Sequence, residues 1–288
     1  MTKRTRIAPH DVCWYACLRP DEIERQVATA PVAFVPWGAL EWHSVHLPLG
    51  LDGIVAEAIA ARIAERTGGV VLPACYLPIA ALPHRFSLTF RATTVRAVLD
   101  DLLAELARAG FRVVVILAGH HERGHEMVLI EAAEDAFTQH HLLVLATPPL
   151  AVVDPALLDH AGRWETSALL ATEPQLVDLR QLQWALRAYP AGRLSELGIQ
   201  GELPIAAASA GAGEVVLERA VITIARLVSA LLASDDPAPL QEYYAGRRAE
   251  HQDYVQRYFT GSWEEAAERW WTDILQSEHS HTSVTGSR

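Results

Sequence analysis

Two short polar segments of this chain contain the side chains that bind metal ions in proteins. The first, residues 38–48, includes a Glu-Trp-His sequence and is followed by a lone aspartate, and the second, residues 119–125, includes a His-His-Glu sequence. Carboxylate and imidazole ligands of this kind suit zinc, manganese and iron alike. The predicted metal ligands are Glu41, His43, Asp52, His120 and Glu122.

The spacing within these segments favours two metal ions over one. In a Glu-x-His or His-x-Glu pair on extended backbone, the two side chains lie on one side of the strand, about 6 to 7 Å apart. That separation can straddle two ions about 3.5 to 4 Å apart, with one ligand for each ion. A single carboxylate such as Asp52 can then bridge them. Each histidine taken singly is more often a surface residue, but the clustering of all five candidates favours a metal site.

Both segments begin where a predicted strand ends. Residues 31–37 and 111–119 are short apolar runs rich in valine, which is typical of strands in a parallel sheet. Residues 69–75 and 141–147 have the same character. In an open parallel sheet the carboxyl ends of the strands meet at one edge, where ligands bind. We therefore expect the two polar segments to lie together.

Amphipathic helices alternate with these strands, which predicts an α/β fold with a mostly parallel sheet covered on both faces. Val95, Val98 and Leu106 belong to an apolar stripe that recurs every three or four residues, and Gly110 ends that helix. Similar patterns predict further helices near residues 52–66 and 216–231.

The composition predicts three regions. Residues 1–237 are expected to form one large α/β domain, residues 238–275 an aromatic-rich helical extension, and residues 276–288 a disordered tail of small and polar residues. Because the extension holds so many aromatic side chains, we expect it to pack against the body of the protein or a neighbouring subunit.

The net charge of -11, from 24 basic and 35 acidic residues, argues against a nucleic-acid partner, since no basic stripe reverses it locally. No apolar run is long enough to cross a membrane, and the N-terminal segment lacks the apolar core of a signal peptide. The three cysteines are too irregularly spaced for a disulfide framework. We therefore predict a cytoplasmic protein with no membrane partner.

A third polar element, residues 159–167, runs from a loop into a helix. His160 lies two residues before a glycine at the start of that helix. The pattern leaves two interpretations open. His160 is either a proton donor and acceptor at neutral pH or an ordinary polar loop residue, in a loop whose helix is capped by Thr166 or Ser167.

At these residues the sequence resembles the creatininase family, also called creatinine amidohydrolases. The family signature Gly-Ser-x-Glu-Gln-His-Gly-x-His-Leu-Pro, followed by a metal-binding aspartate, stands at residues 38–48 as Gly-Ala-Leu-Glu-Trp-His-Ser-Val-His-Leu-Pro. The family pattern His-x-Gly-x-x-Glu-Thr-Ser stands at residues 160–167, and residues 198–202 are similar to its late Gly-x-x-Gly-Asp. The resemblance spans about residues 30–230.

The resemblance implies a three-layer α/β/α sandwich, a binuclear metal site and a homohexamer. Carried over by position, Glu41 and His120 bind one metal. His43 and Glu122 bind the other, and Asp52 bridges the two ions. The resemblance also implies a proton-shuttle role for the histidine at position 160.

The residues around the predicted ligands depart from the family. Ala118 and Arg123 replace two asparagines, and His121 replaces a tyrosine of creatininases. Residues 156–158 are Ala-Leu-Leu where creatininases have a tryptophan lid, and the Phe-Pro-Gly-Thr segment is replaced at residues 88–93. The metal ligands are therefore retained while the substrate contacts are altered.

We predict that His121, Trp42 and Arg123 contact the substrate, although Arg123 has a surface ion pair as its alternative role. The predicted reaction is hydrolysis of a carbon–nitrogen bond in a small molecule, such as an amide, cyclic amide or formamide. A metal-bridging hydroxide would be the nucleophile, and His160 would protonate the departing nitrogen. Hydrolysis of a cyclic ketone or a small peptide is an alternative. A non-catalytic, metal-stabilised binding or assembly protein is an alternative of another class.

Overall fold

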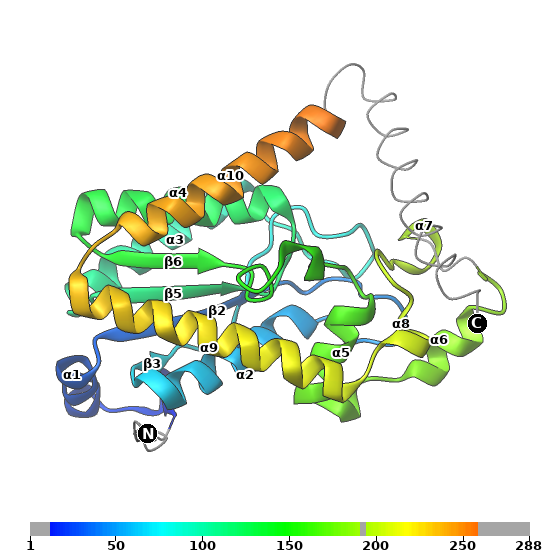
Figure 1. Cartoon of the computed structure of the whole chain (residues 1–288), viewed down its shortest axis with the longest axis horizontal. Coiled ribbons are helices and arrows are strands. Elements are labelled where there is room, and N and C mark those ends of the chain that lie inside the picture. Colours follow the sequence, from blue (N-terminus) through cyan, green and yellow to red (C-terminus); the bar gives the residue numbers. More distant parts are fainter. Residues whose placement is uncertain (1–11, 191–193, 259–288) are drawn as a thin grey trace, which may run out of the picture. The chain divides into compact units, whose positions relative to one another are not determined.

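The computed structural model describes residues 12–190 and 194–258 of the chain (Figure 1). The predicted extension beyond residue 258 and the predicted tail at residues 276–288 lie outside the described residues. Contacts divide the described chain into two compact units. The sheet unit comprises residues 12–41, 49–157 and 215–237, and the helical unit comprises residues 42–48, 158–190, 194–214 and 238–258. The domain boundaries at residues 237 and 275 stay a prediction.

One six-stranded sheet forms the centre of the sheet unit, and every strand pairing among the described residues is parallel. The strand order is β1-β3-β2-β5-β6, with β4 paired to the end of β2. The strands are β1 (Cys13–Trp14), β2 (Val32–Gly38), β3 (Val70–Val71), β4 (Cys75–Tyr76), β5 (Val113–Ala118) and β6 (Leu143–Thr147).

The two central strands, β2 and β5, are buried along their whole length. Their valine-rich sequences suit a position that is covered on both faces, as predicted. The register pairs Trp37 of β2 with Ala118 of β5, so that both strands end at the same edge of the sheet. The C-terminal ends of β2 and β5 therefore lie side by side, and the two polar segments begin there.

The strand predicted at residues 69–75 is instead two short strands. Pro73 interrupts it, because proline lacks the N–H that a ladder needs. β3 pairs with β2 near its start, whereas β4 pairs with Trp37 and Gly38 at its end. After this break the chain runs past the carboxyl edge of the sheet.

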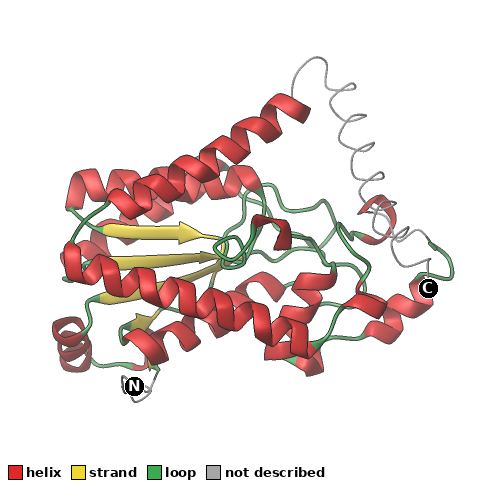
Figure 2. Ribbon diagram, viewed as in Figure 1, coloured by secondary structure: helices red, strands yellow, loops and turns green. Residues whose placement is uncertain are grey.

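Helices cover both faces of this sheet (Figure 2). α2 joins β2 to β3 and α4 joins β5 to β6 in the opposite direction, so that right-handed connections place them on opposite faces. α3 packs beside α4, and Arg66 of α2 pairs with Glu218 of α9 at 2.7 Å. The unit is the predicted three-layer α/β/α sandwich. Its helices are α1 (Pro20–Thr29), α2 (Leu51–Thr67), α3 (Ala92–Arg108), α4 (Arg123–His140) and α9 (Ala210–Ser234) from residue 215 onward.

The apolar stripe on α3 is narrower than the sequence predicts. Val95 and Leu106 are buried, but Val98 is 37% exposed, since its position turns away from the sheet face of the helix.

The helical unit contains α5 (Arg163–Thr172), α6 (Leu179–Ala185), α7 (Leu194–Leu197), α8 (Pro204–Ala207) and α10 (Ala238–Tyr258). α10 begins the predicted aromatic segment, and its Tyr244 is buried. No described helix combines the length and the apolar character that a membrane crossing requires.

Main-chain contacts hold the start of α2 against the ends of the two central strands. A Cβ on Gly38 would lie 2.2 Å from the nitrogen of Gly53, and a Cβ on Gly119 would lie 2.1 Å from the carbonyl oxygen of Asp52. Only glycine permits backbones to approach this closely. The two glycines therefore bring Asp52 to the edge where β2 and β5 end.

The substitution Gly119→Ala should lower the free energy of unfolding by about 1–3 kcal/mol, because the added methyl group forces α2 away from β5. Urea denaturation would measure the change. Gly246→Ala is the matched control, since a Cβ there meets no atom within 4 Å. That change lies within α10 and should raise stability by about 0.5–1 kcal/mol. A Gly119→Ala protein as stable as wild type would contradict the contact.

Candidate metal centre

Three predicted ligands lie together in the sheet unit. Glu41, Asp52 and His120 each offer a ligand atom, and these atoms all lie within 4.8 Å of one another. Glu41 comes three residues after β2, Asp52 belongs to the first turn of α2, and His120 comes two residues after β5. All three side chains are buried. The sheet edge thus assembles these residues from three separate elements, as the strand-end argument predicts.

The imidazole of His120 faces both carboxylates. Its Nδ1 lies 2.9 Å from Oε2 of Glu41 and 3.6 Å from Oδ2 of Asp52. Its Nε2 lies 2.9 Å from the carbonyl oxygen of Ile79. Because a carbonyl only accepts, Nε2 carries a proton, and Nδ1 is the nitrogen that can bind a metal.

The charges of this group fit a divalent cation. Burial alone would lower the pKa of His120, but hydrogen bonds to Asp52 and Glu41 raise it well above its ordinary value. The two carboxylates therefore stabilise a positive charge at Nδ1. A buried pair of carboxylates with one imidazole is also the donor set of zinc, manganese and iron sites. A bound cation would balance the negative charge in place of the proton.

Glu122 has a second role in the structure besides its predicted one. It is the N-cap of α4, and its carboxylate accepts a hydrogen bond from the N–H of His125. Among the described residues it does not belong to the group formed by Glu41, Asp52 and His120. Its role as a metal ligand stays a prediction. His121 and Arg123 flank it, and both are half-buried.

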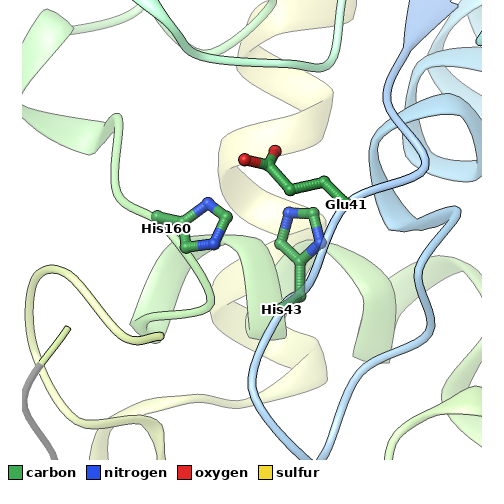
Figure 3. A group of neighbouring side chains, drawn as sticks. All are labelled: Glu41, His43 and His160. Atoms are coloured by element: carbon green, nitrogen blue, oxygen red, sulfur yellow. The ribbon is translucent and has the colours of Figure 1, made fainter. Parts of the chain in front are cut away.

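The helical unit brings His43 beside His160. Their rings stack with centroids 4.4 Å apart. Figure 3 shows the two side chains next to each other. Nε2 of His43 lies 3.6 Å from Oε2 of Glu165, a residue of α5. Nε2 of His160 donates to the carbonyl oxygen of Trp42 at 2.9 Å. This bond leaves Nδ1 of His160 as the nitrogen that can accept a proton.

Acidic side chains hold the loop that carries His160. The carboxylate of Asp159 accepts from the N–H groups of Trp164 and Glu165, at 2.7 and 3.1 Å, and so satisfies the start of α5. The carboxylate of Glu165 accepts from the N–H of Ala161 at 2.6 Å. Capping of α5 by Thr166 or Ser167 is therefore wrong, because both residues lie within the helix.

The late segment at residues 198–202 pairs with this same loop. His160 and Gln200 exchange main-chain hydrogen bonds of 3.0 and 2.8 Å. Gly201 has a φ of 108° and packs against Asp159, where a Cβ would lie 2.9 Å from that of the aspartate. The two sequence patterns at residues 160–167 and 198–202 are thus one structural element.

Comparison with known proteins decides the family. The sequence description of the family Creatininase, creatinine amidohydrolase, matches residues 17–228. The chain belongs to the creatininase family. It is a metal-dependent amidohydrolase of the creatininase type, in agreement with the resemblance.

Two characterised relatives within the creatininase family are similar in sequence. Creatinine amidohydrolase of Pseudomonas putida is 30% identical over 187 residues, which are 55% of this chain and 71% of the relative. The mycofactocin precursor peptide peptidase of Mycolicibacterium smegmatis is 30% identical over 201 residues, 63% of this chain and 78% of the relative.

Solved creatininase structures share the fold. A crystal structure of creatinine amidohydrolase superimposes with a TM-score of 0.65 at 26% identity, covering 76% of this chain and 97% of the other. Other matching structures are a manganese creatininase and a creatininase variant of Zn-Zn type, with TM-scores of 0.63 and 0.64. Divalent metal ions are therefore the cofactors of this family site.

Sequence reasoning assigned no role to three buried polar residues of the helical unit. Asp159 and Glu165 lie within the quoted patterns, but their bonds go to main-chain N–H groups, which leave no mark on the sequence. The third is His46, whose Nε2 lies 3.0 Å from Oγ1 of Thr166. Burial, with a smaller effect of His43, lowers the pKa of His46 to about 4, so that the ring stays neutral.

The substitution Asp159→Ala should lower the free energy of unfolding by about 0.5–2 kcal/mol, because two N–H groups of α5 lose their acceptor. Thermal or urea unfolding would measure the loss. Asp178→Ala is the graded control, since the Asp178 carboxylate accepts from one main-chain N–H at the start of α6, that of Arg180, and from the Arg180 side chain. A loss no larger than that of Asp178→Ala would count against the Asp159 contacts.

Proposed function

We propose that this enzyme hydrolyses a carbon–nitrogen bond of a small molecule at a centre of two divalent metal ions. The proposed ligands are those of the sequence pattern: Glu41, His43, Asp52, His120 and Glu122. The observation that most supports this proposal is the buried group of Glu41, Asp52 and His120, whose ligand atoms lie within 4.8 Å of one another. Manganese and Zn-Zn forms of creatininase favour a divalent centre of this kind.

The metal ions, when bound, would polarise the substrate carbonyl and lower the pKa of a water molecule. The protein contributes the orientation of the ligands. The main chain of Ile79 holds His120 so that Nδ1 points to Glu41 and Asp52. Burial of these side chains excludes solvent from the charges and strengthens their interaction with a cation.

His160 is the proposed proton shuttle. Its Nε2 is committed to the carbonyl oxygen of Trp42, so Nδ1 is the atom that takes a proton from water and passes it to the departing nitrogen. Glu165 and Asp159 fix the loop on either side of this histidine. The half-buried ring of His160 keeps enough access to exchange protons.

Contacts to the substrate are assigned to His121, Trp42 and Arg123. All three side chains are half-buried, and each is polar or aromatic. An imidazole and a guanidinium at residues 121 and 123 favour a substrate with a carboxylate or another acceptor group. They differ from the tyrosine and asparagine of creatininases, which argues for a substrate other than creatinine.

A small peptide is the second candidate substrate, because one relative is a precursor peptide peptidase that is 30% identical to this chain over 201 residues. Arg123 could contact the carboxylate of a peptide as well as that of another small molecule. The cyclic ketone alternative has no comparable support. The homohexameric assembly and cytoplasmic location stay predictions from the sequence.

Removing metal with a chelator should abolish hydrolysis of the amide and peptide substrates in a screen, and adding zinc or manganese should restore it. Elemental analysis of the purified protein should find two divalent ions per chain. Glu122→Gln should lower that ratio, because a neutral amide is a weaker ligand than a carboxylate. A wild-type protein with no transition metal would rule out the centre.

The substitution His160→Ala should lower kcat by about 10²–10⁴-fold while the metal content stays unchanged, because it removes proton transfer and no proposed ligand. Steady-state kinetics on the best substrate of the screen would measure this. His140→Ala, at an exposed position on α4, is the control and should leave kcat unaltered. Equal rates for wild type and His160→Ala would remove the shuttle from the mechanism.

A further inference from the structure

Two histidines of the sheet unit contact the main chain of one residue. The carbonyl oxygen of Ile79 accepts a hydrogen bond from Nε2 of His120 at 2.9 Å. The N–H of Ile79 donates to Nδ1 of His125 at 3.3 Å. The two rings meet edge to face, with centroids 5.2 Å apart. Ile79 thus connects a proposed metal ligand to a histidine in the first turn of α4.

These two bonds fix the proton positions on both rings. A carbonyl oxygen only accepts, so His120 carries its proton on Nε2 and turns Nδ1 toward Glu41 and Asp52. A main-chain N–H only donates, so His125 has no proton on Nδ1 and carries it on Nε2. His125 is therefore neutral and acts as an acceptor.

The loop around Ile79 is held at several points against the ligands. Trp37 donates from Nε1 to the carbonyl oxygen of Leu77 at 3.1 Å, and the N–H of Leu82 donates to the carboxylate of Glu41. Ala80 has a left-handed φ of 54°, a backbone conformation that is unfavourable for alanine. A turn with this strain keeps its shape only where its neighbours hold it. His125 is one of those neighbours.

Packing alone does not explain a histidine at position 125. Its ring is completely buried, and its Nε2 has no hydrogen-bond partner among the described residues. A buried donor without a partner destabilises the folded state, because it loses its hydrogen bonds to water. A phenyl ring of similar shape would fill the same space without that cost. What phenylalanine lacks is the acceptor at Nδ1.

We propose that His125 is a positioning residue of the metal centre. Its Nδ1 holds the Ile79 main chain in the orientation in which the Ile79 carbonyl fixes His120 with Nδ1 toward the carboxylates. This proposal rests on the metal centre proposed above, and it adds a residue that no ligand pattern includes. Interactions behind a metal-binding histidine set its tautomer and its orientation.

The test compares His125→Phe with His125→Asn in the metal-free full chain. Zinc affinity is measured by competition with a chromophoric chelator. His125→Phe keeps the ring but loses the acceptor, and it should bind zinc about 10–100-fold more weakly. His125→Asn places an amide oxygen where Nδ1 lies, and it should return the affinity to near the wild-type value. His140→Phe, an exposed change on the same helix, should bind zinc as wild type does.

Urea unfolding of the metal-free proteins separates positioning from folding. His125→Phe should be at least as stable as wild type, since it removes a buried donor without a partner. Wild-type zinc affinity in His125→Phe would overturn the positioning role, as would an equal loss in the asparagine and phenylalanine variants. A wild-type protein that binds no zinc would overturn the metal centre itself and this proposal with it.

Discussion

The first turn of α2 touches the ends of β2 and β5 main chain to main chain. Gly38 and Gly119 leave no side chain between these backbones, and the main chain of Asp52 and Gly53 occupies the space that their side chains would fill. The carboxylate of Asp52 therefore reaches the sheet edge at the point where Glu41 and His120 leave the two central strands. Without this contact, three residues from three elements would not lie within ligand distance of one another. The other interactions among Glu41, Asp52 and His120 depend on this contact.

Charge balance follows from that placement. Two buried carboxylates repel each other, and burial without a cation is costly for both. His120 supplies one positive charge when protonated, and a divalent ion supplies more. An ion bound at the proposed centre would therefore couple metal binding to folding, because the unfolded chain has no comparable site. The loop at residues 77–82, which contacts both Glu41 and His120, would share in this coupling.

The sequence predicted the fold class and the edge at which the site lies. Valine-rich runs identified β2 and β5, and side chains at their ends identified Glu41 and His120, because side-chain type and spacing carry that information. The break at Pro73 and the exposure of Val98 were not predicted, since pairing partners and helix rotation depend on tertiary contacts.

The contacts behind the ligands were also beyond sequence reasoning. His125, Glu165 and Asp159 accept hydrogen bonds from main-chain N–H groups. Every residue except proline has such a group, so the sequence does not show which one is the donor. Family resemblance supplied the proposed role of His160, and the pairing of its loop with Gln200 came from the structure alone.

Ile79 contacts the two histidines through its N–H and its carbonyl oxygen. Neither hydrogen bond depends on which side chain stands at this position, as long as the residue is not proline. The residue at this position can therefore differ among related proteins while the same two hydrogen bonds persist. A comparison of aligned sequences would then score the position as variable and pass over it. The proposed positioning of His120 thus depends on a residue whose side chain takes no part in the two hydrogen bonds.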